Sequence, residues 1–525
     1  MTDAASPQRV LVVGYGPVGA RFAENLLPAV RAGRIALTVV GAEAGDAYNR
    51  VLVAEYAVGI MERDSLTIAD RDAVEAAGGR VLTGVAVREL DRSAREALLS
   101  DGQRIAYDRV VLATGSRANI PTLNGVERTS PVHRPAGFDD ALPRGVTALR
   151  DLDDADRIRG AVDAGQRIVV LGAGVLGLEF ALAAAHAGAS VAVIHHGPHP
   201  MPRNLDRGAG AVLRKAVQQT GVSIFAHSRA ESVLFRTGED AQPRFDRLLT
   251  ADGKEIAGDL LVLSCGVSPR AELAEAAGLH ASFGVAVDST LRSFTDPSVF
   301  AIGDCAHIAD PADLAAGGRL TGAPSGLIGP GWRQADWLAA RFVDAVDHGD
   351  PANGDVAPPP EREPLVMLKA EHVDVVAAGD VSADPWDDDA GGRSVAQWAD
   401  PEHHRYVKMI SVGGVLTGFV CVGMPRTAAE LTLLYERGDE LPADRSLLLR
   451  FDGPDFDPSA AAEALAPTAT VCWCNGVTVG RIESSIGAGN TTVECVGRDT
   501  RAGTGCGGCR GRITDLLARH AVEPV

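Results

Sequence analysis

The sequence predicts an α/β protein with two Rossmann-type domains, a small α+β domain and a small C-terminal domain that carries cysteines. Two observations predict the Rossmann domains. A buried strand, a glycine-rich turn and a helix follow one another at Gly14, and again at Gly172. The third observation is that four of the eight cysteines lie in the last tenth of the chain. At 525 residues the chain is too long for one hydrophobic core.

Composition and charge exclude several classes of protein. The hydrophobic content of 46% is that of a globular protein, and the formal net charge of −19 argues against nucleic acid as a partner. No apolar run reaches the ~18 residues of a membrane span, and residues 1–7 lack the features of an export signal. Free or metal-bound thiols suit a reducing compartment. We therefore expect a cytoplasmic protein without membrane contact, and a homodimer remains open.

The first glycine turn predicts a dinucleotide site. A strand over residues 9–13 runs into Gly14, Gly16 and Gly19, and a helix over 20–27 follows. The glycines allow a tight turn and let a pyrophosphate approach the helix N-terminus. The next strand ends shortly before Glu43, whose carboxylate is placed to accept hydrogen bonds from an adenosine ribose.

The second turn repeats this pattern. A strand over residues 166–171 precedes Gly172, Gly174 and Gly177, and a helix over 178–187 follows. Two such units in one chain imply two dinucleotides.

The residues after the strand at 190–194 bear on the choice of coenzyme. An NAD site usually places an acid there to hold the ribose 2′-OH. This chain has His195 and His196 instead, with Arg203 soon after, and no carboxylate to repel a 2′-phosphate. The sequence therefore favours NADPH, with NADH as the alternative.

Segments 107–116 and 295–304, which end in Thr114-Gly115-Ser116 and Gly303-Asp304, support FAD at the first turn. With the two glycine turns, they resemble the two-dinucleotide-binding-domain flavoproteins of glutathione-reductase-like fold over about residues 1–345. In that superfamily the aspartate matching Asp304 binds the flavin's ribityl chain. The cofactor-binding residues expected are Gly14, Gly16, Gly19, Glu43, Arg50, Thr114, Gly115, Gly303 and Asp304, and for the nicotinamide coenzyme Gly172, Gly174, Gly177, Glu179, His195, His196, Arg203 and Gly266.

No cysteine precedes Cys265, so the redox cysteine pair of the disulfide reductases of this fold is missing. Cys265, Cys305, Cys421 and Cys495 are interpreted as small apolar residues. Hydride transfer to a flavin requires no general acid or base, and no side chain is assigned as catalytic. The flavin's electrons therefore need another acceptor.

The C-terminal cysteines supply that acceptor. Cys472, Cys474, Cys506 and Cys509 form two close pairs, which can hold a [2Fe–2S] cluster or a zinc ion. Glycines around the second pair leave backbone N–H groups free to point at bridging sulfides, which favours the cluster. Together with the helical run 513–518, the block resembles the bacterioferritin-associated ferredoxins.

A closer resemblance comes from segments 47–52, 264–270, 326–335 and 368–380. They are similar to the N-terminal half of bacterial NAD(P)H nitrite reductase large subunits and to the electron-transfer subunit of assimilatory nitrate reductase. The resemblance implies an oxidoreductase that passes electrons from NADPH through FAD and the cluster to a molybdenum-containing nitrate reductase subunit. Because cysteine pairs with siroheme-domain spacing are missing, we do not expect the chain itself to reduce nitrite in the manner of those large subunits.

The expected domains are the first part of the FAD domain at 1–145, the NAD(P)H domain at 146–275, the second part of the FAD domain at 276–349, the small α+β interface domain at 365–450 and the [2Fe–2S] domain at 468–525. A proline-rich linker covers 350–364. Two other functions remain open: an amine or opine dehydrogenase with an internal [2Fe–2S] relay, and a plain flavin reductase with a zinc-bound C-terminal module.

Overall fold

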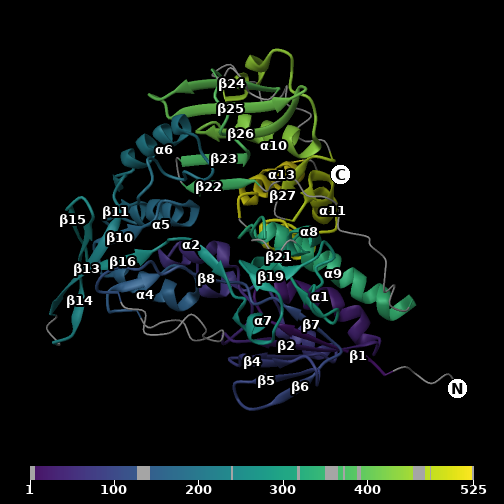
Figure 1. Ribbon diagram of the computed structural model, residues 1–525. Coiled ribbons are helices and arrows are strands. Elements are labelled where there is room, and N and C mark those ends of the chain that lie inside the picture. The colour runs from purple at the N-terminus through teal and green to yellow at the C-terminus, as the bar shows by residue number, and fades with distance from the viewer. Residues whose placement is uncertain are drawn as a thin grey trace.

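The computed structural model describes residues 6–126, 142–237, 241–315, 320–348, 365–370, 373–386, 392–452, 467–472, 475–505 and 507–522. Cys474, Cys506 and the expected linker over 350–364 lie outside these ranges. Figure 1 shows two α/β units in the lower and left parts of the molecule, a green sheet at the top, and the yellow C-terminal segment between that sheet and the lower unit. None of the helices in the described ranges is long and apolar enough to cross a membrane.

The first parallel sheet is built from both ends of the Rossmann region. Its strands read as continuous apolar runs, as expected for a sheet covered on both faces, and Val12 and Val39 are fully buried. The order is β20 (Val299–Ala301), β7 (Arg109–Leu112), β1 (Gln8–Val13), β2 (Ile35–Gly41) and β3 (Arg80–Thr83).

Two long helices cover this sheet together. Helix α1 (Pro17–Arg31) follows the first glycine turn, and α9 (Ile328–His348) packs along it. The rings of Phe22 and Phe342 meet edge to face with their centroids 5.4 Å apart. The indole N–H of Trp332 donates to the carbonyl oxygen of Pro17 at 3.1 Å. The start of α9 is thereby fixed beside the first glycine turn.

The second parallel sheet is continuous in sequence. Its order is β12 (Ser223–Phe225), β11 (Val191–Ile194), β10 (Ile168–Leu171), β16 (Leu260–Leu263) and β9 (Val146–Ala148). Three helices contact strands of this sheet: α4 (Leu152–Asp163), α5 (Val175–His186) and α6 (Arg207–Gln219).

Shorter elements complete the two units. The remaining strands are β4 (Val87–Asp91), β5 (Glu96–Leu99), β6 (Arg104–Ala106), β8 (Ser116–Ala118), β13 (Ala230–Thr237), β14 (Pro243–Thr250), β15 (Glu255–Ala257), β17 (Val267–Pro269), β18 (Ala281–Ser282), β19 (Gly284–Val287) and β21 (Ala306–Ile308). The short helices are η1 (Arg50–Leu52), α2 (Val53–Ala57), η2 (Arg63–Leu66), α3 (Arg71–Ala76), α7 (Glu272–Ala276), η3 (Gly303–Cys305) and α8 (Pro311–Ala315).

The small domain is an antiparallel sheet with a helix on one face. The strand order is β22 (Val366–Ala370), β23 (Val373–Gly379), β26 (Val415–Val422), β25 (Arg405–Val412) and β24 (Arg393–Asp400). Helix α10 (Pro425–Arg437) and η4 (Arg445–Asp452) cover one face, and α5 and α6 contact the other. The sequence predicts a hairpin followed by a helix here; the structure contains both and adds three strands.

The C-terminal segment is a small helical unit around a two-stranded sheet. It comprises β27 (Thr470–Cys472), β28 (Val477–Thr478), α11 (Val479–Gly487), α12 (Val493–Thr500) and α13 (Arg510–Val522). Its own apolar core includes Ile482, Val496 and Ile513, all fully buried. The predicted fold class is confirmed: two Rossmann units, an α+β sheet domain and a small cysteine-bearing unit.

Candidate functional site

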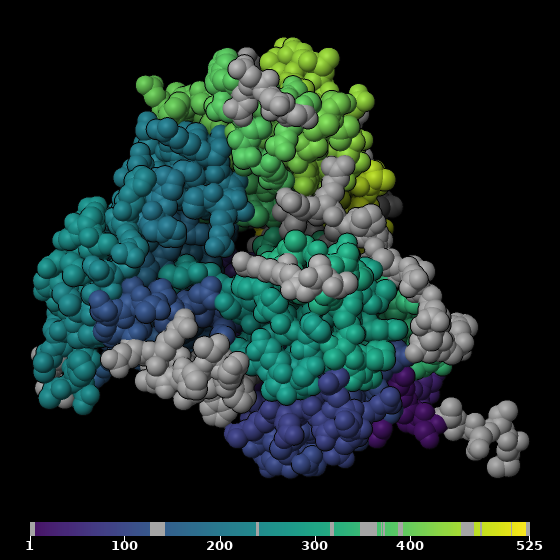
Figure 2. All heavy atoms as spheres, in the orientation of Figure 1, coloured from purple at the N-terminus to yellow at the C-terminus, as the bar shows by residue number. Residues whose placement is uncertain are grey.

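One cavity of about 3100 Å³ runs through the middle of the molecule, and Figure 2 shows the surface hollowed there. Both Rossmann units, the small domain and the C-terminal unit contribute to its wall. Nine of the residues predicted to bind cofactors line it: Gly14, Gly16, Glu43, Arg50, Thr114, Gly115, Glu179, Gly303 and Asp304.

The first glycine turn leaves an open cradle at the start of α1. Gly14 has φ +118°, and a Cβ there would overlap the carbonyl oxygen of Ala113. A Cβ at Gly19 would overlap the carbonyl oxygen of Gly14, so both positions require glycine. A Cβ at Gly16 would meet no atom of the described residues within 4 Å, so the helix N-terminus is open to an anionic group. This cradle fits the pyrophosphate of a dinucleotide.

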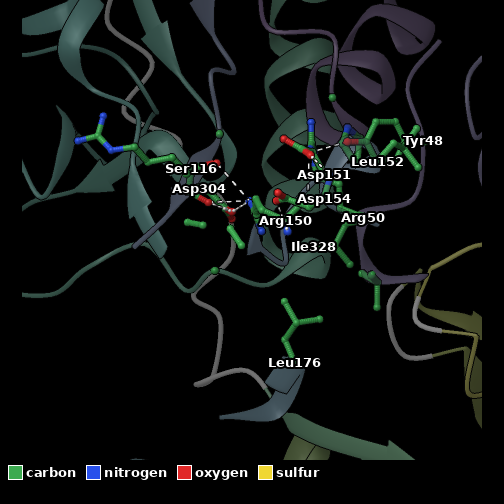
Figure 3. A pocket seen from close by; sticks show the side chains of 18 of the residues that line it. Tyr48, Arg50, Ser116, Arg150, Asp151, Leu152, Asp154, Leu176, Asp304 and Ile328 are labelled. Atoms are coloured by element: carbon green, nitrogen blue, oxygen red, sulfur yellow. Dashed lines mark hydrogen bonds and ion pairs between the residues drawn. The ribbon is translucent and has the colours of Figure 1, made fainter. Parts of the chain in front are cut away.

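Asp304 belongs to a polar cluster that joins distant segments (Figure 3). Its Oδ2 accepts a hydrogen bond from Ser116 Oγ at 2.6 Å and one from Arg150 Nη2 at 3.0 Å. Arg150 also donates to Ser116 Oγ at 2.7 Å. Burial lowers the pKa of Arg150, although the Asp304 charge partly offsets this effect. Sequence reasoning missed Arg150, because nothing local in 146–151 signals a partner 154 residues away.

Glu43 and Arg50 form an ion pair at the end of β2. Tyr48 Oη donates to Glu43 Oε2 at 2.7 Å, and the Arg50 guanidinium lies 4.7 Å from the centroid of the Tyr48 ring. Burial raises the pKa of Glu43, but the Arg50 charge and the Tyr48 hydrogen bond outweigh it and hold that pKa below its ordinary value. The carboxylate is thus ionised and can accept from a ribose hydroxyl.

The second glycine turn has the same construction. Gly172 has φ +121°, and a Cβ there would overlap the carbonyl oxygen of Ser264. A Cβ at Gly177 would lie 2.5 Å from the carbonyl oxygen of Gly172, whereas Gly174 faces open space. Gly266 has φ +84° and accepts a backbone hydrogen bond from Asn119 at 2.9 Å. The three glycines of this turn are not among the residues that line the cavity, whereas Glu179 of α5 is.

The three residues predicted to choose the coenzyme differ in environment. The His195 side chain is buried, with 5% of its surface exposed, and neither ring nitrogen has a hydrogen-bond partner among the described residues. Burial, followed by the charges of His196 and His199, lowers the pKa of His195 to about 4, so its ring is neutral at pH 7. His196 and Arg203 are exposed.

The described half of the cysteine site is buried. Cys472 ends β27 and Cys509 precedes α13, with exposed fractions of 1% and 7%. The Gly503 N–H donates to Cys509 Sγ at 3.1 Å, and Asn475 Nδ2 lies 3.7 Å from Cys472 Sγ. Donors of this kind stabilise thiolate ligands of an iron–sulfur cluster. Cys474 and Cys506 lie outside the described residues, within which no group of three metal ligands gathers.

Of the other cysteines, Cys305 and Cys421 are buried, and Cys265 and Cys495 are partly buried. Burial raises the pKa of the Cys265 thiol to about 11, and it also raises the pKa values of Cys305 and Cys421. Cys305 Sγ donates to the carbonyl oxygen of Leu112 at 3.2 Å. These thiols stay protonated at neutral pH, and they are poor nucleophiles for redox chemistry.

The first glycine cradle and Asp304 lie on the cavity, and a second glycine turn and a cysteine-bearing unit adjoin it. This combination is that of an NAD(P)H-dependent flavoprotein oxidoreductase with an iron–sulfur domain. Comparison with known families agrees. The pyridine nucleotide-disulphide oxidoreductase family matches residues 8–322, and the BFD-like [2Fe–2S] binding domain matches residues 470–519. The chain belongs to the pyridine nucleotide-disulphide oxidoreductase family, whose cofactors are FAD and a nicotinamide nucleotide.

Relatives that match nearly the whole chain are named as subunits of nitrate or nitrite reductases. The assimilatory nitrate reductase electron transfer subunit of Bacillus subtilis is 27% identical over 97% of this chain and 59% of its own length. The NAD(P)H nitrite reductase large subunit of Klebsiella oxytoca is 28% identical over 98% of this chain and 49% of its own length. The resemblance expected from the sequence is confirmed. The chain spans about half to three-fifths of the length of these relatives.

Solved structures share the fold. The covalent putidaredoxin reductase–putidaredoxin complex superposes with a TM-score of 0.67 at 24% identity, covering 88% of this chain and all of that chain. The NAD-dependent persulfide reductase of A. fulgidus superposes with a TM-score of 0.66 at 25% identity, covering 82% of this chain and 77% of that chain. Neither the structure nor these comparisons support a homodimer.

Proposed function

We propose that the chain is the electron-transfer component of an assimilatory nitrate reductase, which takes electrons from NADPH and delivers them to a molybdenum-containing catalytic subunit. The observation that carries this proposal is the shared cavity. It reaches from Gly16 and Asp304 at the flavin end to Asn475 and Gly476 beside Cys472. The name of the Bacillus subtilis relative supports the choice of partner, since that relative matches 97% of this chain.

The chain's own residues bind and orient the cofactors. The N–H groups at the start of α1 would hold the FAD pyrophosphate, and those at the start of α5 the pyrophosphate of the coenzyme. Asp304, kept in place by Ser116 and Arg150, would receive the ribityl chain. Ile328 and Leu176 add apolar surface to the cavity wall (Figure 3). Hydride acceptance, which moves two electrons and one proton, is the chemistry that FAD would supply when bound. Release of electrons one at a time is the chemistry that the cluster would supply.

We further propose NADPH as the coenzyme. His196 and Arg203 are exposed beyond the end of β11, and both can donate hydrogen bonds to a 2′-phosphate. His195 is neutral and buried, so it would not bind the 2′-phosphate through charge. It would contribute to NADPH binding by fixing the position of the chain at the end of β11.

The test of the function is the metal and flavin content of the chain purified without oxygen. We expect about two irons and two labile sulfides per flavin, and an electron paramagnetic resonance signal after reduction. Cys509→Ser should remove the iron while NADPH still reduces a dye, because dyes take electrons directly from the flavin. One zinc per chain without sulfide would overturn the cluster and favour the plain flavin reductase.

Substrate and partner are tested separately. Rapid bleaching of the flavin by NADPH is expected, and bleaching by an amine or opine would favour the self-contained dehydrogenase. With the native nitrate reductase subunit added, NADPH oxidation should become dependent on nitrate. If the purified partner pair oxidises NADPH equally fast without nitrate, the proposed acceptor is wrong.

A further inference from the structure

The cysteine unit and the flavin half are joined by a buried contact at Asn49. This side chain has 1% of its surface exposed, and its Nδ2 donates to the carbonyl oxygens of Thr504 at 2.7 Å and Gly505 at 2.6 Å. These two residues immediately precede the expected ligand Cys506. Asn49 itself immediately precedes Arg50, on the segment that lines the flavin end of the cavity.

The Asn49 side chain is held from both ends. Its Oδ1 accepts the N–H of Val51 at 3.0 Å and so caps η1. The Asn49 backbone N–H donates to the carbonyl oxygen of Leu66 at 2.7 Å. One amide group therefore satisfies a helix start in the flavin half and two carbonyl oxygens in the cysteine loop. An aliphatic residue would leave these buried carbonyls without the donor, which is costly away from water.

A second contact reaches the cysteine unit from α1, at the turn between β27 and β28. Arg21 Nη1 donates to Asn475 Oδ1 at 2.7 Å, while Asn475 Nδ2 donates to the carbonyl oxygen of Arg501 at 2.7 Å and lies 3.7 Å from Cys472 Sγ. Asp336 of α9 fixes the Arg21 guanidinium through Nε at 2.6 Å. The helix whose N-terminus forms the first glycine cradle is thus linked through two side chains to Cys472, an expected cluster ligand.

An ion pair closes the outer edge of this contact. Arg501 Nη2 lies 3.2 Å from Glu24 Oε2, again on α1, and the Arg501 guanidinium is 38% exposed. Near the cysteine loop, a Cβ at Gly507 would lie 3.7 Å from Leu52 Cδ2. The contact therefore has a buried polar centre at Asn49, an apolar neighbour and a charged rim.

We propose that Asn49 is a positioning residue that fixes the Thr504–Gly505 backbone on the flavin half, so that the cysteine unit works from one docked position and does not swing between flavin and partner. The inference rests on the proposed function and adds the place where electrons cross between the units. Because transfer of each single electron depends steeply on separation, a shift of the cysteine unit from this docked position would slow the transfer.

Asn49→Asp is the sharpest test. The carboxylate keeps an oxygen for the Val51 cap but replaces the NH₂ donor with an acceptor that faces two carbonyls. The matched control is Asn490→Asp, because Asn490 Nδ2 donates to Ser485 Oγ at 3.0 Å within the cysteine unit. Hydrogen–deuterium exchange is measured on the full chain with its cofactors, over peptides spanning 49–52 and 501–505.

We expect slow exchange of both peptides in the wild type, and exchange at least ~10-fold faster in Asn49→Asp but not in Asn490→Asp. Fast exchange of these peptides in the wild type, or an equal effect of both variants, would overturn the docked position. Should Asn49→Asp fail to fold, Asn49→Ser serves in its place, since its hydroxyl can still cap Val51 but is too short to reach both carbonyls.

A spectroscopic readout separates positioning from stability. After rapid mixing with NADPH, the flavin bleaches first and the cluster absorbance falls after a delay. In Asn49→Asp this delay, divided by the time constant of flavin bleaching in the same trace, should lengthen ~10-fold or more. An unchanged delay would show that Asn49 has no positioning role. If the C-terminal unit holds zinc in place of a cluster, the proposed function fails and there is no cluster absorbance to follow, yet the exchange measurement still reports the docking.

Discussion

Arg150 lies just before α4, and Asp154 lies in the first turn of that helix; Asp154 is buried and Arg150 is partly buried. Arg150 turns toward Asp304 in the cavity, whereas Asp154 accepts from Thr147 Oγ1 at 3.0 Å and from the Arg150 N–H at 3.1 Å. Burial, and then the charge of Asp151, raise the pKa of Asp154 to about 6. The ionised Asp154 therefore costs folding free energy.

The cost of that charge predicts a pH dependence of stability. The ordinary pKa of Asp154 is 3.8 and its folded pKa is about 6, so between these values the folded chain retains a proton that the unfolded chain has lost. The stability contributed by the protonated carboxyl is complete below pH ~4 and is lost as pH rises through 6, by roughly 3 kcal/mol. The free energy of unfolding of the wild type relative to Asp154→Asn should fall by that order between pH 4 and 7. Asp153→Asn, on the exposed side of the same turn, is the control. If the wild type lost as much stability relative to Asp153→Asn over this pH range, the raised pKa could not be assigned to Asp154.

The residues after β11 predict the coenzyme preference. His196→Glu and Arg203→Glu each place a carboxylate where a 2′-phosphate is proposed, and they should weaken NADPH binding by ~1–3 kcal/mol, or about 5- to 150-fold in Kd. Binding of NADH should hold or improve. Titration of coenzyme quenching measures both constants, and a wild type that prefers NADH would contradict the assignment.

At the scale of elements, Lys408 and Tyr406 of the small domain join its antiparallel sheet to α6 by contacting Asp206. Lys408 of β25 is 3% exposed, and its Nζ lies 3.0 Å from Oδ2 of Asp206, the residue that caps α6. Tyr406 Oη donates to the same oxygen at 2.5 Å. Burial, followed by the Asp206 hydrogen bond, raises the pKa of Tyr406, so the phenol remains a donor at any physiological pH.

The contact predicts a strong energetic coupling between Lys408 and Asp206 in the free energy of unfolding. Lys408→Met removes the cation and leaves a largely buried carboxylate, so it should destabilise the chain by ~3–5 kcal/mol. Lys408→Met combined with Asp206→Asn should cost less than the sum of the two single changes, because the second change removes the unpaired charge. Thermal unfolding of the four proteins of this cycle measures the difference. Additive effects would show that the pair contributes no coupling energy.

Elements were predictable wherever their signal is local. The strand at 9–13 and the helix at 20–27 correspond to the longer β1 and α1, because a buried apolar run, a glycine turn and a periodic helix adjoin in sequence. β24 was not predicted, since its alternation over Arg393–Asp400 is weakly apolar and its pairing with β25 supplies the structure. Asn49 contacts a segment 455 residues away and Arg150 contacts one 154 residues away, and no local pattern encodes either contact.

At the scale of the whole molecule, the cysteine unit is docked inward and presents basic side chains outward. Arg501 is used in the internal contact with Glu24, and Arg510 lies 2.6 Å from Glu494 within the unit. Arg498, Arg510 and Arg512 are exposed. An acidic face on a partner subunit would be attracted to this side of the molecule, against the overall negative charge of the chain.

That arrangement predicts a salt-sensitive reaction with the partner. Nitrate-dependent NADPH oxidation should fall as salt rises from ~0.1 M to 1 M, where the Debye length shrinks from ~10 Å to ~3 Å, while dye reduction holds steady. The double change Arg510→Glu and Arg512→Glu should slow only the partner reaction. Equal loss of both activities would mean that these arginines serve the stability of the unit.

The first parallel sheet also sets an order of events during synthesis. Its edge strand β20 begins at Val299, whereas its neighbour β7 ends at Leu112, and the second Rossmann unit falls inside that interval. At the ~5–20 residues per second of translation, the sheet waits roughly 10–40 s for its last strand. The inserted unit, whose strands are contiguous in the chain, can finish folding on the ribosome first. In a nascent chain stalled before residue 299, the coenzyme unit could be folded while the flavin half still lacks β20 and Asp304.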